Sequence, residues 1–597
     1  MSAQQIDLSI SSLASLYRVH RSTPAQVLRE IHARADKSDA AIWIHRVPLS
    51  KQLSHAERLM RDPAALKLPL YGIPFAVKDN IDVEGLPTTA ACPDYAYVAR
   101  HTAPSVQRLL DAGAICIGKT NLDQFATGLV GTRSPYGAVS NPFDARYISG
   151  GSSSGSAVAV ATGLASFALG TDTAGSGRVP AAFCNIVGLK PTRGLLSSRG
   201  IMPACRTLDC VSIFALNALD AQTLFDVSNA LDSQDPCARL DREACRDTSA
   251  PTFRFGIPDT ANLEFFGDDE YRRLYEEAIA RTEELGGTAV PVDVAPLLEA
   301  ADLLYNGPWV AERYVATREF MDRSPQSLVP VIEQVIGAAR NFSAADTFAA
   351  MYTLADIRLK TRSIWSQIDA LLLPTAASHY TIAAVNADPI HLNSRLGRYT
   401  NFVNLLDLSA IAVPSGFTRA GLPFGVSFIA PAMHDRLLCA LGGRYHAATG
   451  LKAGAMQTEV PPYPLLAEAK DEVALAVVGA HLQGLPLNHQ LVTAGARLLR
   501  STRTEAAYSL YALPNTTPPK PGLVRDGDSA IDVEVWSFPL STFGAFVASI
   551  PAPLGIGTLR LEDGSEVKGF LCEAHAVVGA NDISALGGWR AYLKAQT

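Results

Sequence analysis

The stretch GGSSSGSAVAVATGLASFALGTDTAGSGRVPAA, residues 150–182, places an apolar run between two loops rich in serine, glycine and threonine. The apolar run predicts a buried helix followed by a buried strand, since it contains no charged residue and is flanked by turn-forming residues. Serine in such loops usually caps helices and satisfies turn backbone. Two hydroxyl-rich loops at one edge of a sheet, however, lie where α/β proteins bind ligands. The stretch therefore predicts an α/β core with a candidate site made of hydroxyl groups.

The same alternation of strand and helix continues on the N-terminal side. LYGIPFAVKDNIDVEG, residues 70–85, predicts a strand that ends in a polar turn, and SVQRLLDAGAICIGKTN, residues 105–121, predicts a helix and then a strand. Helical periodicity in residues 1–60 indicates a helical lead-in. Together these segments predict an α/β domain with a mixed or largely parallel sheet covered by helices.

The length of 597 residues is too great for one ordinary core, so we expect two domains. We assign residues 1–450 to the large domain and the Pro-bearing residues 451–470 to a linker. Residues 471–597 alternate as β-strands do and contain a hairpin turn at Asp563–Gly564. They predict a small β-rich α+β domain.

The composition narrows the class of protein. The formal net charge of −7 lacks the basic footprint of most nucleic-acid-binding proteins. The nine cysteines form no CxxC pair, which disfavours a zinc site or a disulfide framework. No secretion signal and no long apolar stretch are visible. We therefore expect a cytoplasmic protein that binds neither nucleic acid nor membrane.

A serine nucleophile needs a base, and histidine is the usual one. No histidine lies between His101 and His379, and no GxSxG motif stands out. Lys78 instead ends the apolar strand GIPFAVKDN, where burial would favour a neutral amine able to accept a proton. A lone lysine at a strand end is normally a solvated charge, so this alternative stays open.

The segments GIPFAVKDN, GGSSSGSA and GTDTAGSGRVPAA, in this order, resemble the amidase signature family over about residues 60–430. The resemblance implies the amidase signature fold and a Ser-cisSer-Lys triad of Lys78, Ser152 and Ser176. It implies that Ser176 attacks an amide carbonyl and forms an acyl-enzyme, while Ser152, after a cis peptide bond, relays the proton to neutral Lys78.

The resemblance also implies the groups around the triad. Four successive backbone amides would form the oxyanion hole, those of Thr173, Ala174, Gly175 and Ser176. Ala174 replaces the more common glycine there. Three neighbouring side chains are expected to support the site with hydrogen bonds: Ser153, Asp172 and Arg178. Ser153 is also expected to contact the substrate.

Two further segments, FATGLVGTRSPYGAVSNPFD at 125–144 and ADLLYNGPWVAERYVATREF at 301–320, resemble the allophanate hydrolase branch of that family. Its substrate is a small carboxylate, for which the resemblance implies Tyr305 and Arg313 as anchors. Eight helical residues span about 12 Å, so the two side chains can converge only if the helix breaks, and Gly307–Pro308 is a suitable break.

Weaker candidates surround these anchors. Arg313 could instead pair with a surface acid such as Glu312 or Glu319. Gly128 lies where backbone could approach a substrate, and Arg133 is a second possible anion contact.

Residues 471–597 resemble the C-terminal domain of longer allophanate hydrolases and a gamma-glutamylcyclotransferase-like fold. The resemblance implies a role for His481 in decarboxylating N-carboxycarbamate, although a histidine at a strand end is more often structural. Glu573 matches the acid of the cyclotransferases, but VGAH replaces their YGSN at residues 478–481, which argues against cyclotransferase activity.

We therefore expect an enzyme that hydrolyses allophanate to ammonia and N-carboxycarbamate, and ultimately to carbon dioxide, without metal or cofactor. A biotin-dependent urea carboxylase would supply the substrate, and a homodimer is expected by analogy. The alternatives are a malonamate-type amidase, a subunit of a tRNA-dependent amidotransferase and, least favoured, a non-catalytic binding protein on the same scaffold.

Overall fold

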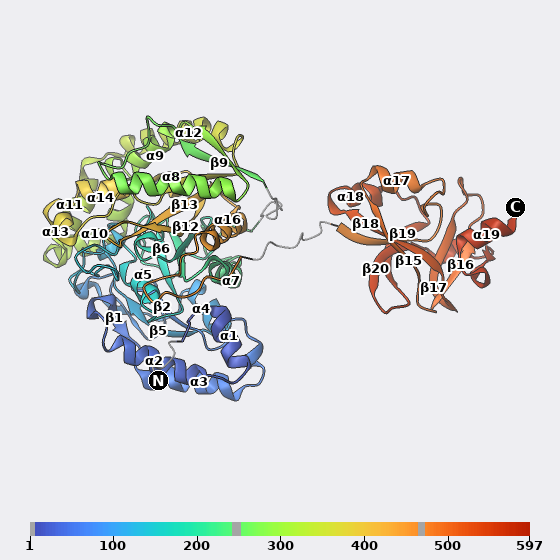
Figure 1. Cartoon of the computed structure of the whole chain (residues 1–597), viewed down its shortest axis with the longest axis horizontal. Coiled ribbons are helices and arrows are strands. Elements are labelled where there is room, and N and C mark those ends of the chain that lie inside the picture. The colour runs from blue at the N-terminus through green and yellow to red at the C-terminus, as the bar shows by residue number, and fades with distance from the viewer. Residues whose placement is uncertain (1–5, 242–251, 464–471, 597) are drawn as a thin grey trace. The chain divides into compact units, whose positions relative to one another are not determined.

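The computed structural model describes residues 6–241, 252–463 and 472–596. The chain folds as two compact units, Met1–Leu465 and Leu466–Thr597 (Figure 1). The first unit contains the serine-rich stretch, and it is built around one sheet.

The eleven strands of this sheet lie side by side in the order β1 (Trp43–Arg46), β5 (Ile115–Thr120), β2 (Pro74–Lys78), β6 (Phe167–Asp172), β8 (Cys210–Ala215), β7 (Val187–Lys190), β12 (Leu408–Phe417), β13 (Pro423–Pro431), β11 (Ala370–Pro374), β9 (Phe253–Pro258) and β10 (Gly287–Val292). The sheet is mixed, since β5, β2 and β6 run parallel whereas β6, β8, β7, β12 and β13 alternate in direction. The α/β fold predicted from the sequence is confirmed.

The parallel strands position the site. β2 ends at Lys78, β5 ends at Thr120 and β6 ends at Asp172. The register pairs Lys78 with Thr120 and Val77 with Leu169. Because parallel neighbours end at one edge of a sheet, the loops that follow these strands meet there.

Helices cover this sheet (Figure 1). In chain order they are α1 (Ile10–Arg18), α2 (Pro24–Ala35), α3 (Leu49–Arg61), α4 (Pro104–Asp111), α5 (Ser154–Ala161), α6 (Val179–Phe183), α7 (Ala218–Ser228), α8 (Asp269–Glu284), α9 (Ala295–Asn306), α10 (Val310–Arg323), α11 (Pro330–Gly337), α12 (Ala344–Trp365), α13 (Ile382–Ala387), α14 (His391–Leu396), α15 (Phe402–Leu405) and α16 (Asp435–Ala448). The helical lead-in forms α1, α2 and α3, and α2 begins with a capping box on Thr23 followed by Pro24.

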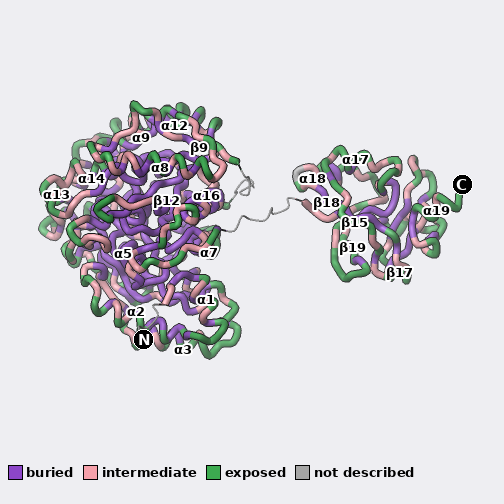
Figure 2. Tube along the Cα trace, in the orientation of Figure 1, coloured by how far each residue is buried: buried purple, intermediate pink, exposed green. Residues whose placement is uncertain are grey.

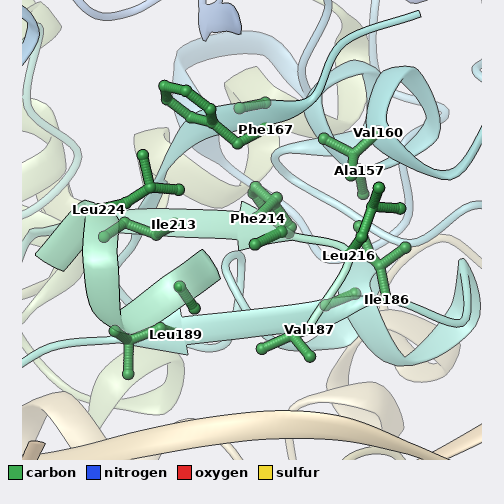
Figure 3. Packing of buried hydrophobic residues seen from close by; sticks show 14 of the residues in the cluster. Ala157, Val160, Phe167, Ile186, Val187, Leu189, Ile213, Phe214, Leu216 and Leu224 are labelled. Carbon is green, nitrogen blue, oxygen red and sulfur yellow. The ribbon is translucent and has the colours of Figure 1, made fainter. Parts of the chain in front are cut away.

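The apolar run of the serine-rich stretch forms α5 and β6, and every residue of both is buried (Figure 2). Phe167 of β6 stacks on Phe75 of β2, with ring centroids 5.0 Å apart. Figure 3 shows Phe167 together with Phe214 and Leu216 from the β8 region in the same packed core. Gly155 allows the close contact of α5 with the neighbouring chain, because a Cβ there would lie 2.4 Å from the carbonyl oxygen of Ile42. The helix therefore holds the loop before it rigidly.

The second unit contains a five-stranded sheet and a three-stranded sheet. The strands of the first are, in order, β15 (Arg497–Arg503), β18 (Asp532–Pro539), β14 (Glu472–Val477), β20 (Glu566–Cys572) and β19 (Leu554–Arg560); those of the second are β17 (Pro521–Ser529), β16 (Tyr508–Ala512) and β21 (Asn581–Asp582). The predicted hairpin turn at Asp563–Gly564 joins β19 to β20. Three helices complete the unit: α17 (Asn488–Thr493), α18 (Leu540–Ala548) and α19 (Trp589–Gln596).

The linker expected at residues 451–470 lies partly outside the described residues. Its described part, up to Tyr463, packs on the first unit: the amide of Gly454 donates to Asn185 O, and the Tyr463 ring lies against Gly443 of α16. Among the helices of the described ranges, none is both long enough and apolar enough to span a bilayer.

Replacing Phe167 by alanine should lower the free energy of unfolding of the first unit by about 3–5 kcal/mol, because it removes a fully buried ring and leaves a cavity. Phe348→Ala on α12 is the matched control, since that ring is 56% exposed and its loss should cost less than about 0.5 kcal/mol. Calorimetry of the full chain measures both variants. Equal shifts of the unfolding transition would contradict the assignment of the core.

Candidate active site

Lys78 is fully buried at the end of β2. Its Nζ lies 2.8 Å from Ser152 Oγ and 2.8 Å from Thr171 Oγ1. Burial lowers the pKa of Lys78 to about 7, against the weaker opposing effect of three acids at longer range, Asp123, Asp209 and Asp172. The solvated surface lysine is therefore excluded, and a substantial fraction of the side chain is a neutral amine near pH 7.

The serines that precede α5 have different roles. Ser152 follows a cis peptide bond with Gly151 and its hydroxyl meets Lys78. The hydroxyls of Ser149, Ser153 and Ser156 donate to backbone carbonyls, those of Val139, Thr171 and Leu169. The substrate contact expected of Ser153 stays a prediction; its buried hydroxyl donates to the carbonyl oxygen of Thr171 near the end of β6. Most of the hydroxyls are thus structural.

Ser176 lies in the loop after β6, and Asp172 holds this loop from within. The Asp172 carboxylate accepts hydrogen bonds from the amides of Gly175 and Gly177, on either side of the serine, at 2.9 and 3.0 Å. It also forms a fully buried ion pair with Arg178, through Nε at 2.9 Å and Nη2 at 3.0 Å. Asp172 and Arg178 are therefore supporting residues, as the sequence predicted.

Ser176 is 3% exposed, and its hydroxyl has no hydrogen-bond partner among the described residues. The loop that carries it packs beside the loop of Ser152, since a Cβ added to Gly150 would lie 2.9 Å from Pro180 Cα of α6. Ser176 thus combines a buried position with an unused hydroxyl, which a nucleophile requires.

The backbone amides around Ser176 differ in availability. Within the described chain, those of Thr173, Ala174 and Ser176 have no hydrogen-bond acceptor, whereas the Gly175 amide donates to Asp172. The contribution of Gly175 to an oxyanion hole stays a prediction, with its amide bonded to Asp172 in this structure. Gly175 is required for another reason, since its φ is +133° and a Cβ there would lie 2.4 Å from Thr400 Oγ1. Ala174 has no positive φ, so its methyl group is tolerated.

Asp123, in the loop after β5, stabilises the segment that precedes Ser152. Its carboxylate accepts hydrogen bonds from the amides of Val130, Gly131 and Arg133, and its own amide donates to Ser152 O. A Cβ on Gly151 would lie 2.2 Å from Asp123 Oδ2. Asp123 therefore fixes the position of the peptide before Ser152.

Arg313 and Tyr305 do converge. α9 ends at Asn306 and α10 begins at Val310, so the break falls at the predicted Gly307–Pro308. Arg313 Nη2 lies 3.4 Å from the Tyr305 hydroxyl, and the guanidinium lies over the Tyr305 ring at 5.3 Å. Glu312 instead accepts hydrogen bonds from Thr207, so the alternative pairing of Arg313 with that acid is wrong.

A second buried guanidinium lies beside the first. Arg133 donates to Thr127 O at 3.1 Å and to Pro389 O, and Arg313 donates to Thr127 Oγ1 at 3.1 Å. Both side chains are at least 97% buried, both leave Nε without a partner, and neither has a carboxylate within 4 Å in the part of the chain that the structure describes. Gly128 packs against Asp123 and Arg133, so a side chain there would displace them.

These two arginines give the site a positive charge that no bound acid neutralises. Buried cations are normally paired. Asp209, a further buried acid, touches Thr173 Oγ1 and accepts the amides of Ala204 and Cys205; burial raises its pKa to about 6. The arrangement can bind a small carboxylate next to an acyl-transfer centre.

In the second unit, His481 lines a cavity of about 290 Å³ together with Gln490, Lys520 and Phe570. Its Nε2 lies 2.9 Å from Gln490 Oε1, and its ring stacks on Phe570 with centroids 5.0 Å apart. Burial, and to a lesser extent the charge of Lys520, lowers the pKa of His481. Glu573 lies outside this cavity and pairs with His575 on the surface.

Sequence reasoning missed Asp123, Thr171 and Asn80. Asp123 and Asn80 each follow a predicted strand by two or three residues, which was a usable signal. Thr171 carried no separate signal, because it lies inside a strand, next to an aspartate that the sequence analysis had already singled out.

Two family models match the chain: one described as Amidase matches residues 26–439, and one described as Allophanate hydrolase C-terminal domain matches residues 473–594. Urea amidolyase of Saccharomyces cerevisiae is 43% identical over 96% of this chain and 32% of its own length, and urea amidolyase of Lachancea kluyveri is 44% identical over 92% and 31%. The chain thus spans about a third of the length of these curated relatives.

Solved structures agree with this relationship. A serine-to-alanine variant of Kluyveromyces lactis allophanate hydrolase is 42% identical, with a TM-score of 0.79 and complete coverage of both chains. The K. lactis urea amidolyase has a TM-score of 0.77 at 42% identity and covers 99% of this chain and 37% of its own. The chain therefore belongs to the amidase family and carries, in its second unit, an allophanate hydrolase C-terminal domain.

Proposed function

We propose that the first unit hydrolyses the terminal amide of allophanate to ammonia and N-carboxycarbamate. The observation that carries this proposal is the combination of an amidase triad with two buried, unpaired guanidinium groups beside a tyrosine hydroxyl. Relatives that cover the whole of this chain include a protein named allophanate hydrolase.

In the proposed mechanism, Ser176 Oγ attacks the amide carbonyl while its proton passes through Ser152 to neutral Lys78. The amides of Thr173, Ala174 and Ser176 stabilise the oxyanion. The proton then returns by the same route to the leaving nitrogen, which departs as ammonia. Water, activated by the same relay, hydrolyses the acyl-enzyme. The base form of Lys78 exists above its pKa of about 7, so activity rises as the pH rises through that value.

The substrate carboxylate would be held by Arg313, Tyr305 and Arg133. Arg313 and Arg133 each retain an unused Nε donor. A charged donor facing a carboxylate in a buried pocket supplies strong and directional hydrogen bonds. These three residues would therefore select amides that carry a carboxylate a short distance from the scissile bond.

We propose further that the second unit, with the cyclotransferase-like architecture expected from its sequence, removes the anionic product by decarboxylation at the His481 cavity. Lys520 lines this cavity and has no acid within ion-pair distance among residues 472–596, so it can hold a carboxylate there. With Nε2 donating to Gln490, His481 Nδ1 keeps a lone pair facing its surroundings. The mainly neutral imidazole suits a proton transfer to or from the nitrogen of the product.

The wider context follows the same chemistry. Allophanate is carboxylated urea, so an enzyme that carboxylates urea must supply it, and we propose a biotin-dependent urea carboxylase. The curated relatives named urea amidolyase are about three times as long as the span they share with this chain. The homodimer and the cytoplasmic location expected from the sequence stay predictions.

The central test is ammonia release from allophanate. The wild type should be active, and Ser176→Ala should lower kcat by at least about a thousandfold, because the acyl-enzyme cannot form. Ser54→Ala is a control in the same unit, at an exposed serine of α3 whose hydroxyl donates to the carbonyl oxygen of Ser50. No ammonia from allophanate with the wild type would refute the substrate, and full activity of Ser176→Ala would refute the mechanism.

The anchor residues are tested by substrate preference. Arg313→Met should raise KM for allophanate and malonamate far more than KM for a neutral amide such as biuret. For allophanate, kcat/KM should fall by about 100-fold or more, since a buried charge-assisted contact is lost. Arg146→Met, at an exposed arginine, is the control. An unchanged preference in Arg313→Met would mean that the carboxylate is held elsewhere.

The second unit is tested with ¹³C-labelled allophanate and NMR. Lys520→Met and His481→Ala should release the first ammonia at the wild-type rate, while labelled N-carboxycarbamate persists longer before carbon dioxide appears. Lys568→Met, at an exposed lysine of β20, is the control. If carbon dioxide forms equally fast in all of these variants, the second unit does not catalyse the decarboxylation.

A further inference from the structure

We propose that Asn80 and Thr171 are positioning residues that hold the Lys78 amine against Ser152 with uncharged groups, and so keep it available as a base. This inference rests on the proposed role of Lys78. It concerns a chain of hydrogen bonds that runs from Met202 O through Asn80 and Thr171 to Lys78.

The orientation of the Asn80 amide is fixed by Met202. The carbonyl oxygen of Met202 can only accept a hydrogen bond, and Asn80 Nδ2 lies 3.2 Å from it. The NH₂ group therefore points to this side, and its second hydrogen reaches Thr171 Oγ1 at 3.3 Å. As a result, the positive end of the amide dipole faces Thr171.

The other end of the Asn80 amide supports this role. Asn80 is 1% exposed, and its Oδ1 has no donor in the described part of the protein. An unsatisfied buried acceptor is destabilising. A residue that leaves its acceptor unused while both of its hydrogens are bonded is present for its NH₂ group.

Thr171 transmits this arrangement to the lysine. Its Oγ1 lies 2.8 Å from Lys78 Nζ, the same distance that separates Nζ from Ser152 Oγ. Two hydroxyl groups thus define where the buried amine sits. Lys78 has no carboxylate within 4 Å among the described residues, so these contacts position the amine without stabilising its charged form as an ion pair would.

A second buried lysine, Lys119, shows how a lysine is held when a carboxylate contacts it. Lys119, one strand away on β5, is equally buried, but its Nζ lies 3.1 Å from the carboxylate of Asp79. That lysine is held by an ion pair with Asp79 and a hydrogen bond to Pro87 O. Asn80 follows Asp79 directly in the chain. The turn after β2 therefore supplies a carboxylate to Lys119, and it supplies an amide to the hydrogen-bonded groups that hold Lys78.

The decisive variant is Asn80→Asp, which places a carboxylate two hydrogen bonds, or about 6 Å, from Lys78 Nζ. The negative charge should stabilise protonated Lys78 and move the acid limb of the kcat profile for ammonia release upward, by about one to two pH units from its wild-type position near 7. Activity lost at pH 7 should then return at pH 9.

Thr171→Val provides the second arm, and it adds no charge. Loss of the acceptor should lower kcat on the order of 10- to 100-fold while KM for allophanate stays within about twofold, because the amine is misplaced but the carboxylate anchors are intact. Thr171→Ser should restore most of kcat. Thr375→Val is the matched control, a fully buried threonine whose hydroxyl bonds Ser427 between β11 and β13.

The outcomes separate this inference from the proposed function. If Asn80→Asp keeps the wild-type acid limb, or if Thr171→Val keeps the wild-type kcat, the inference is wrong even when Ser176→Ala is inactive. If wild type releases no ammonia from allophanate, or Ser176→Ala stays active, the proposed function fails first. Should Asn80→Asp not fold, as judged by circular dichroism, the Thr171 pair still decides.

Discussion

The active centre depends on one costly constraint, the burial of a lysine amine without a carboxylate in contact with it. Desolvation of Lys78 disfavours its charged form by several kcal/mol, which is a large share of the stability of a typical domain. The surrounding structure compensates through extensive apolar packing of α5, β6 and β2 and through hydroxyl contacts at 2.8 Å. The core and the catalytic group are thus parts of one arrangement.

The carboxylates near the site are bonded to other groups, so that none of them contacts Lys78. Asp172 is neutralised by Arg178 and by two backbone amides, and Asp123 is occupied by three backbone amides. Each acid stabilises a loop and leaves no oxygen free for Lys78. The positive charge that we propose for binding an anionic substrate comes instead from Arg313 and Arg133.

The sequence was sufficient for the α/β fold and for the break between α9 and α10, because each depends on local patterns. The choice of Lys78, Ser152 and Ser176 came from the resemblance to the amidase signature family, and local patterns alone left it open. The sequence was not sufficient for contacts formed across the fold. The hydrogen bond from the Gly175 amide to Asp172 had no sequence signal. Thr171 and Asp123 gain their meaning only from partners that packing brings close.

The support of the nucleophile loop reaches far along the chain. Gly175 packs against Thr400, Arg178 donates to Thr400 O, and Asn404 donates to the carbonyl oxygens of Asp172 and Leu208. Contacts separated by more than 200 residues form only after the later segment has been synthesised. A nascent chain on the ribosome therefore carries Lys78, Ser152 and Ser176 long before the loop of Ser176 can form these contacts.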